Sequence, residues 1–292
     1  MGSPKYLNMI HAFLMALSLC SCSNNGHEYD MHDIVVEGWI DNGQNPVVII
    51  TKSLYLQINS KIEINDSYVG TGAVVKVSCE GGDTAILEGK TDTHYLPPYI
   101  YTTDKITGQA GKTYSLCVEL DQYRATAQTV IPLEQAVIDS FRIEPSADSD
   151  SLLSLSAFVS NPNKCRYMST FIAAKPDANY LMNAYMGTYK DQKFEGGSNI
   201  IELNKPYKSI ATRDIYYSDF NYGDSVTIKF SGIDSLAYEF WNNIGIISTI
   251  KNNTITGDIK NAKGNISGGL GYWFGYNSSI YTLILPEKKQ IQ

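Results

Sequence analysis

Histidine and cysteine are scarce in this sequence, whose 292 residues include 4 His and 5 Cys. His94 is the single histidine after residue 32, and there is no Gly-x-Ser-x-Gly motif. A serine or cysteine hydrolase needs a nucleophile, a base and an acid that orients the base. Because the base is almost absent, we predict no catalytic residues and no enzymatic activity.

Metal-ligand clusters and basic blocks are also lacking. Five residues between His27 and Asp33 could chelate a metal only weakly, because they lie in a polar segment without periodicity. We therefore expect no metal site and no cofactor. The formal net charge is −7 and no Lys/Arg-rich block occurs, which argues against nucleic acid as a partner.

One apolar run occurs near the N-terminus, and no second run reaches transmembrane length. Residues 13–17 follow a single lysine and are too few to span a bilayer. The run ends at Leu19-Cys20-Ser21-Cys22, which looks like a bacterial lipobox with Leu at −3 and Ser at −1. We predict a signal peptide over residues 1–21 and lipid attachment to Cys22. An ordinary signal peptide without lipid is the alternative.

The remaining cysteines allow at most one disulfide. If Cys20 is removed and Cys22 carries lipid, Cys79, Cys117 and Cys165 are left in an oxidising compartment. Strand alternation places Cys79 on an apolar side and Cys117 on a polar side, so a bond between them is not expected. We predict free thiols.

The first part of the mature chain has the period-two pattern of strands. Residues 22–32 are polar and predict a flexible stalk, and the folded part begins at about Asp33. Six or more short strands with almost no helical pattern predict an immunoglobulin- or transthyretin-like β-sandwich over residues 33–132. Ile131-Pro132 ends this block, because proline cannot donate to a central ladder. The predicted strands are residues 34–40, 46–51, 73–80, 84–88, 113–120 and 123–130.

Residues 133–292 predict a second β-rich domain with one main helix. Strands are expected at Val137 to Ile143 and at Leu152 to Val159. From Asp234 to Asn243 the apolar residues instead recur at i, i+3, i+4 and i+7, with Asp234 able to cap the first turn. We predict that this helix stops near Gly245 and packs on the sheet.

The segment from Gly268 to Tyr276 combines glycines with aromatic residues. No lysine-serine pair follows it, so a phosphate loop is not expected. Its aromatic side chains could anchor a partner, or they could be interior residues beneath which glycines shape the backbone. The candidate partner-binding residues are Gly269, Gly271, Tyr272, Trp273 and Phe274.

Several segments together resemble a family of Bacteroidota lipoproteins called domain of unknown function 4249. They are the lipobox, residues 34–40, 111–116 and 131–132, and the run from Asn265 to Phe274. Members of this family tend to be encoded beside TonB-dependent outer-membrane receptors and have no established catalytic residues. The resemblance implies an accessory role in nutrient capture or receptor assembly.

The resulting functional hypothesis is a lipid-anchored, non-enzymatic outer-membrane protein that binds a TonB-dependent receptor, its nutrient ligand, or both. A glycan, a peptide and another small molecule are all open as the ligand. A surface adhesin or structural spacer is the alternative, and an exported hydrolase is less favoured. The stalk carries no dense acidic run after Cys22, so both the cell surface and the periplasmic face are compatible with the sequence.

Overall fold

The computed structural model describes seven stretches of the chain, all of which belong to one compact unit, residues 32–292. The predicted signal peptide, Cys22 and the predicted stalk lie outside them. The stretches are residues 34–52, 68–159, 165–176, 178–191, 199–206, 218–250 and 263–288.

The first half of the described chain is built of strands, as predicted. In β1 the side chains of Ile34, Val36 and Ile40 are buried and alternate with partly exposed ones, because successive strand residues point to opposite faces. The expected hairpins β3–β4 and β6–β7 are present. The strands are β1 (Ile34–Asp41), β2 (Val47–Lys52), β3 (Val74–Cys79), β4 (Thr84–Thr91), β5 (Tyr99–Thr102), β6 (Thr113–Leu120) and β7 (Tyr123–Val130).

The second half is also β-rich and contains the one helix of the described stretches, which confirms the mainly β fold class. The strand expected at Val137 to Ile143 begins three residues later. The elements are β8 (Ser140–Pro145), β9 (Leu152–Phe158), β10 (Tyr167–Lys175), β11 (Met182–Lys190), β12 (Ile200–Leu203), β13 (Phe220–Asn221), β14 (Ser225–Gly232), α2 (Ser235–Ile250) and β15 (Leu270–Ile284).

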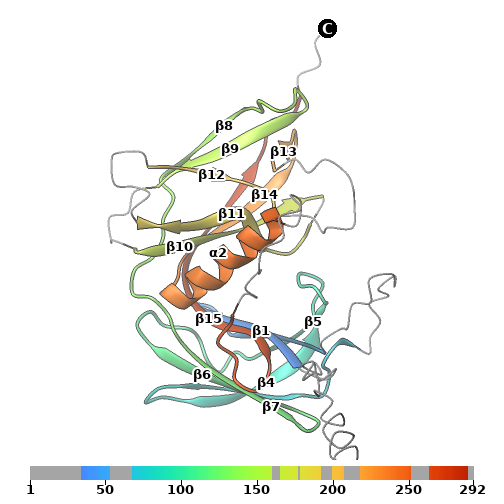
Figure 1. The fold of residues 1–292 in the computed structure, drawn as a ribbon, viewed down its shortest axis with the longest axis vertical. Coiled ribbons are helices and arrows are strands. Elements are labelled where there is room, and N and C mark those ends of the chain that lie inside the picture. Colours follow the sequence, from blue (N-terminus) through green and yellow to red (C-terminus); the bar gives the residue numbers. More distant parts are fainter. Residues whose placement is uncertain are drawn as a thin grey trace, which may run out of the picture. The chain divides into compact units, whose positions relative to one another are not determined.

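The strands form two sheets (Figure 1). The larger has 11 strands in the order β11-β10-β14-β15-β1-β2-β5-β4-β3-β6-β7, and in the 4-stranded sheet β9 pairs with β8, β12 and β13. Strands from both predicted domains therefore lie in one hydrogen-bonded sheet. The domain boundary near Pro132 and the immunoglobulin- or transthyretin-like topology stay predictions.

Strand β15 joins the two parts of the larger sheet because it changes partner along its length. Residues Leu270 to Tyr276 pair with β1 in parallel, whereas Asn277 to Ile284 pair with β14 in antiparallel register. The glycine- and aromatic-rich segment is therefore the first half of a strand. The described residues form four apolar cores. One contains Trp273 and inward-facing residues of β1 to β7, a second lies between β9, β10 and β14, a third lies under α2, and a small fourth consists of Val47, Ile49 and Ile100 on β2 and β5.

Helix α2 begins as predicted and ends later than predicted. The backbone N–H of Ala237 donates to the carboxylate of Asp234 at 2.7 Å, which caps the first turn. Phe240 and Trp241 are buried against the sheet, and α2 packs on β10 and β11 (Figure 1). The predicted stop near Gly245 is wrong, because the helix continues to Ile250.

The physical reason is the small size of the glycine penalty. A helical glycine costs about 1 kcal/mol relative to alanine, which the packing of the aromatic face outweighs. No helix in the described part of the chain has both the length and the apolar character needed to cross a bilayer.

Candidate functional site

The predicted partner-binding aromatics lie in the interior. Trp273 is fully buried in the core of the first seven strands, and its indole N–H donates to the backbone oxygen of Tyr114 at 3.0 Å. Phe274 is equally buried on the opposite face of β15. Alternation along β15 sends neighbouring side chains into two different cores, which is why so aromatic a segment exposes few of them.

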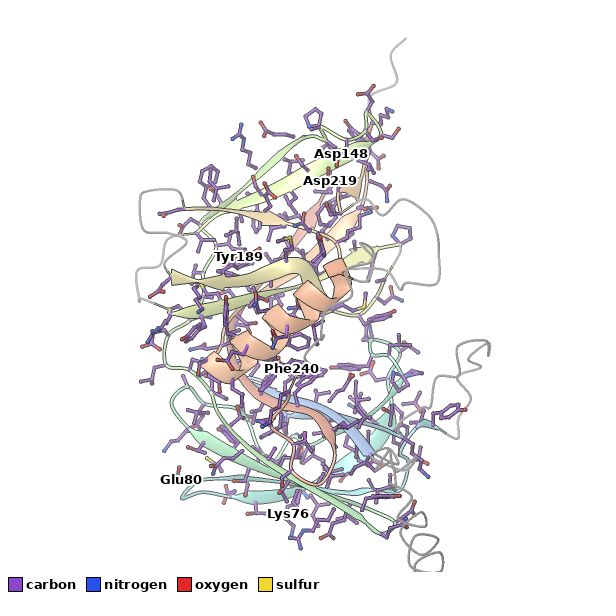
Figure 2. The ribbon with its side chains drawn as sticks, in the orientation of Figure 1. Lys76, Glu80, Asp148, Tyr189, Asp219 and Phe240 are labelled. Carbon is purple, nitrogen blue, oxygen red and sulfur yellow. The ribbon has the colours of Figure 1, made fainter. Side chains whose placement is uncertain are left out.

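The third core lies between β15 and α2. The Tyr272 and Phe274 rings are stacked with centroids 5.2 Å apart, and the Phe240 ring lies 5.4 Å from Phe274. Figure 2 labels Phe240 on α2. The indole N–H of Trp241 donates to the Tyr276 hydroxyl at 3.1 Å. Burial holds the pKa of both tyrosines well above the ordinary range, so they stay neutral.

The two predicted glycines allow β15 to approach β1 closely. Gly271 has a φ of +104°, and a Cβ atom there would lie 2.0 Å from the backbone oxygen of Val36. At Gly269 a Cβ atom would lie 2.8 Å from the backbone oxygen of Ile34. The burial of Tyr272, Trp273 and Phe274 agrees with the interior alternative that the sequence left open, and their role in binding a partner stays a prediction. The exposed side chain of this segment is Leu270, at 51%.

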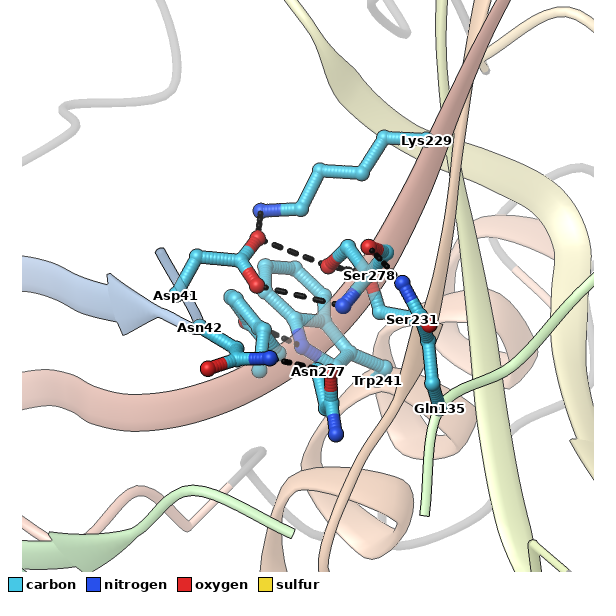
Figure 3. Close-up of polar contacts among 9 residues, drawn as sticks. Asp41, Asn42, Gln135, Lys229, Ser231, Trp241, Asn277 and Ser278 are labelled. Atoms are coloured by element: carbon cyan, nitrogen blue, oxygen red, sulfur yellow. Dashed lines mark hydrogen bonds and ion pairs between the residues drawn. The ribbon is translucent and has the colours of Figure 1, made fainter. Parts of the chain in front are cut away.

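A buried polar network, here called the junction, lies where β15 changes partner (Figure 3). At its centre the Lys229 ammonium lies 2.9 Å from the Asp41 carboxylate, and their side chains are 10% and 6% exposed. Asp41 also accepts from the backbone N–H of Ser278 at 3.2 Å and from its hydroxyl at 2.7 Å. The Ser231 hydroxyl must then donate to Ser278 across 2.8 Å, because a serine has one hydroxyl hydrogen.

Amide side chains extend the junction to two more segments. Asn42 donates to Asn277 at 3.1 Å, and Asn277 donates to the backbone oxygens of Pro132 and Leu133 at 3.0 Å each. Gln135 donates to the backbone oxygen of Ser278 at 2.8 Å. The junction therefore ties β1, β14, β15 and the segment after β7 together.

The junction contains serines and a lysine, but its geometry does not suit a nucleophile and base. A lysine base must be neutral, whereas Lys229 is held by the Asp41 carboxylate and lies 4.5 Å from the centroid of the Tyr276 ring. The Ser278 hydroxyl hydrogen points at the same carboxylate. Every polar group in this centre already has a partner, so the arrangement stabilises the crossing of the strands. Sequence reasoning missed it because no local pattern links residues so far apart.

His94 lies in the loop after β4, where its side chain contacts the carboxylate of Asp92. The two are joined by a 2.8 Å contact between Nδ1 and Oδ1, and the histidine side chain is 73% exposed. The backbone N–H of His94 and then its ring lower the pKa of Asp92. This is a capped surface turn, and in the described loop the side chain that contacts His94 is the carboxylate of Asp92.

The described part of the chain contains no group of three or more His, Cys, Asp or Glu residues that could hold a metal ion. Cys79, Cys117 and Cys165 form no disulfide in the described structure. Cys117 lies opposite Lys76, whereas Cys79 lies opposite Tyr114 and packs at the core, so the two thiols occupy the predicted opposite faces. Burial raises the pKa of Cys165 to about 11.

A shallow cavity of about 460 Å³, here called the groove, lies on the outer face of β3, β6 and β7. Strand register arranges its side chains in two rows across these strands. One row contains Lys76, Cys117 and Thr126, and the other contains Ser78, Ser115 and Gln128. Figure 2 labels Lys76 on β3.

The segment before β15 forms one wall of the groove. Ser267 bridges to Thr126 through two backbone hydrogen bonds of 2.9 and 2.8 Å. The Asn265 side chain donates to the backbone oxygens of Gln128 at 3.0 Å and Trp273 at 2.7 Å, and accepts from the Trp273 N–H at 2.7 Å. Asn265 therefore attaches the wall both to β7, through Gln128, and to the buried core, through Trp273.

The groove differs from the junction in its unpaired polar groups. Lys76 is the one charged residue in its lining, and no described acidic residue pairs with it. The described contacts give the hydroxyls of Ser78, Thr126 and Ser267 no intramolecular partner, and Gln128 reaches Ser115 only at 3.4 Å. These groups are available to a polar ligand.

Comparison with known proteins gives one family. The family described as Domain of unknown function (DUF4249) matches residues 26–282, which include the groove, the junction and nearly all of β15. No curated protein matches the chain.

Proposed function

Because the chain belongs to the DUF4249 family, we propose that it is a non-enzymatic, lipid-anchored accessory protein of the outer membrane. In this proposal it binds a TonB-dependent receptor, the receptor's nutrient ligand, or both. The observation that carries the proposal is the groove, where the Lys76 ammonium and the hydroxyls of Ser78, Thr126 and Ser267 have no intramolecular partner in the described structure. Such groups bind polar ligands, and they include no acid–base pair that would transform one.

The proposed anchor limits how far the folded part lies from the membrane. The 12 residues from Cys22 to Asp33 span at most about 40 Å when extended. Ile34 follows at the start of β1, and the adjacent Val35 pairs with Leu270. The exposed Leu270 therefore lies beside the point where the tether joins the domain, and we assign the receptor contact to this surface.

Co-purification from gently solubilised outer membranes tests the proposal. The wild-type protein should recover a transporter barrel, and a charge placed at the receptor contact should reduce that recovery. Leu270→Asp is the test variant. Ile284→Asp is its matched control, because Ile284 is 81% exposed and lies on the other half of the same strand.

Loss of the receptor with Leu270→Asp and retention with Ile284→Asp would support the assigned contact. Equal recovery with both variants would remove Leu270 from the interface, and recovery of no barrel by the wild-type protein would contradict the receptor proposal. Palmitate labelling of Cys22→Ala tests the anchor separately, since undiminished label would refute attachment at Cys22.

A further inference from the structure

We propose that the groove on β3, β6 and β7 binds a carboxylate-bearing saccharide, such as a short oligomer of a sugar acid. This inference rests on the proposed binding function and names the ligand class of the groove. It follows from the charge of the groove, from the spacing of its hydrogen-bonding groups and from the kinds of side chain that its lining lacks.

Charge selects an acidic ligand. The chain carries a formal net charge of −7, yet the groove lining contains Lys76 and no Asp or Glu. The cross-strand neighbours of Lys76 are Ile86 and Cys117, neither of which is an acid. Two acids lie one step away in the register, Glu88 two residues from Ile86 and Glu119 two residues from Cys117. Neither forms an ion pair with Lys76 in the described structure, and Glu119 is 3.6 Å from Arg124. The Lys76 ammonium is therefore free to pair with a ligand carboxylate.

The spacing of the polar groups suits a ligand with many hydroxyls. Neighbouring strands lie about 4.8 Å apart, so groups across β3, β6 and β7 recur at a separation similar to the width of a sugar ring. Ser78, Thr126 and Gln128 offer donors and acceptors at this spacing, and Ser267 adds one from the wall. A volume of about 460 Å³ falls within the range of small-ligand sites.

The lining disfavours the other acidic ligands. Leu116 is 2% exposed and Ala127 packs against the core, so neither provides an apolar pocket for a peptide side chain. No aromatic residue lines the groove to stack on a nucleic-acid base or a neutral sugar ring. A single lysine matches one carboxylate, whereas phosphate is usually bound by several donors from arginine or a helix N-terminus.

Ligand-observed NMR on the lipidated full-length protein in detergent micelles tests the inference. Digalacturonic acid should bind about tenfold more tightly than galactobiose, its neutral counterpart, and the difference should shrink at high salt. Lys76→Gln should remove the preference for the acid. Lys175→Gln is the matched control, because it removes an exposed lysine at the end of β10 and should leave binding unchanged.

Four outcomes would overturn the inference. They are equal binding of the acidic and neutral disaccharides, no effect of Lys76→Gln, tighter binding of galactose 6-phosphate, and tighter binding of a hexaglutamate peptide. The last two would assign the groove to a phosphate or to a polypeptide.

Thiol protection gives an independent readout, because Cys117 lines the groove. In a Cys79→Ser variant, digalacturonic acid should slow the reaction of Cys117 with a maleimide several-fold, and an unchanged rate would contradict binding in the groove. Failure of the two proposals is distinguishable. If the protein co-purifies with the receptor but does not bind the saccharide, only this inference is refuted. If it binds the saccharide but recovers no receptor, only the receptor proposal is refuted.

Discussion

The junction and the groove are made of similar side chains and differ in how these are paired. Each contains a lysine, serines and amides. In the junction Lys229 meets Asp41 and the serine hydroxyls are bonded, whereas in the groove Lys76 has no acidic partner in the described structure. Residue type therefore does not separate a structural polar cluster from a binding surface. Pairing and burial do.

The pairing has an energetic reason. A buried charge loses its hydration, which is tolerated when an opposite charge and hydrogen bonds replace the water. The junction needs such completeness because it lies in the interior where β15 leaves β1 for β14. The groove faces solvent, where water satisfies the same groups until a ligand displaces it.

The largest effect is expected from breaking the junction. Lys229→Met leaves the Asp41 carboxylate buried without its counter-charge and should lower the free energy of unfolding by about 3 to 5 kcal/mol. Urea denaturation measures the change. Adding Asp41→Asn removes the second charge and should restore most of the loss. A Lys229→Met protein as stable as the wild type would show that the pair contributes nothing.

Asn265 connects the groove wall to the buried core at Trp273. Asn265→Ala removes bonds to the Trp273 backbone and to Gln128, and should cost about 1 to 3 kcal/mol by thermal denaturation. It should also weaken binding of the acidic disaccharide, because the groove wall loses its attachment. Full stability with reduced binding would mean that Asn265 acts on the ligand alone.

Glu37 sharpens the contrast with Asp41, because both carboxyl groups lie on one face of β1. Glu37 lies beside Tyr272, and no described residue forms a hydrogen bond or ion pair with it. Burial raises its pKa above the ordinary value of 4.5, so the folded state binds its proton more readily than the unfolded state.

The protonated Glu37 carboxyl group therefore contributes to the stability of the fold below pH 4.5, and this contribution is lost as the pH rises through the raised folded-state pKa. We expect Glu37→Gln to melt at a higher temperature than the wild type at pH 7, and the difference should narrow as the pH falls. Melting curves of both proteins between pH 4.5 and pH 7 measure the difference at pH 7 and its change with pH. A pH-independent difference would contradict this assignment.

The smallest effect is expected in the groove. Ser78→Ala and Thr126→Val remove hydroxyls that have no intramolecular partner in the described structure, so each should change the free energy of unfolding by no more than about 0.5 kcal/mol. Saccharide affinity should nevertheless fall. Urea denaturation measures the stability of each variant, and a binding titration measures its saccharide affinity. A large loss of stability would show that these hydroxyls stabilise the fold.

Local patterns predicted much of the fold. The β-branched run of β1, the alternation in β3, β6 and β7 and the helical spacing near Ala237 predicted these elements, and the structure confirms them. The predicted end of α2 failed because helix packing outweighed a modest glycine penalty. The aromatic run near Trp273 was consistent with both a core and an interface, since both favour the same residue types.

The sequence by itself determined that this chain is mainly β, where most strands between residues 34 and 130 and the helix begin, and that Cys79 and Cys117 face opposite sides. These properties depend on neighbours within a few positions. Only the tertiary structure decided that Trp273 is interior, that Asp41 meets Lys229, and that Asn265 forms a wall beside β7. Those contacts join residues more than a hundred positions apart, and their register is set by how whole strands pack rather than by any local pattern.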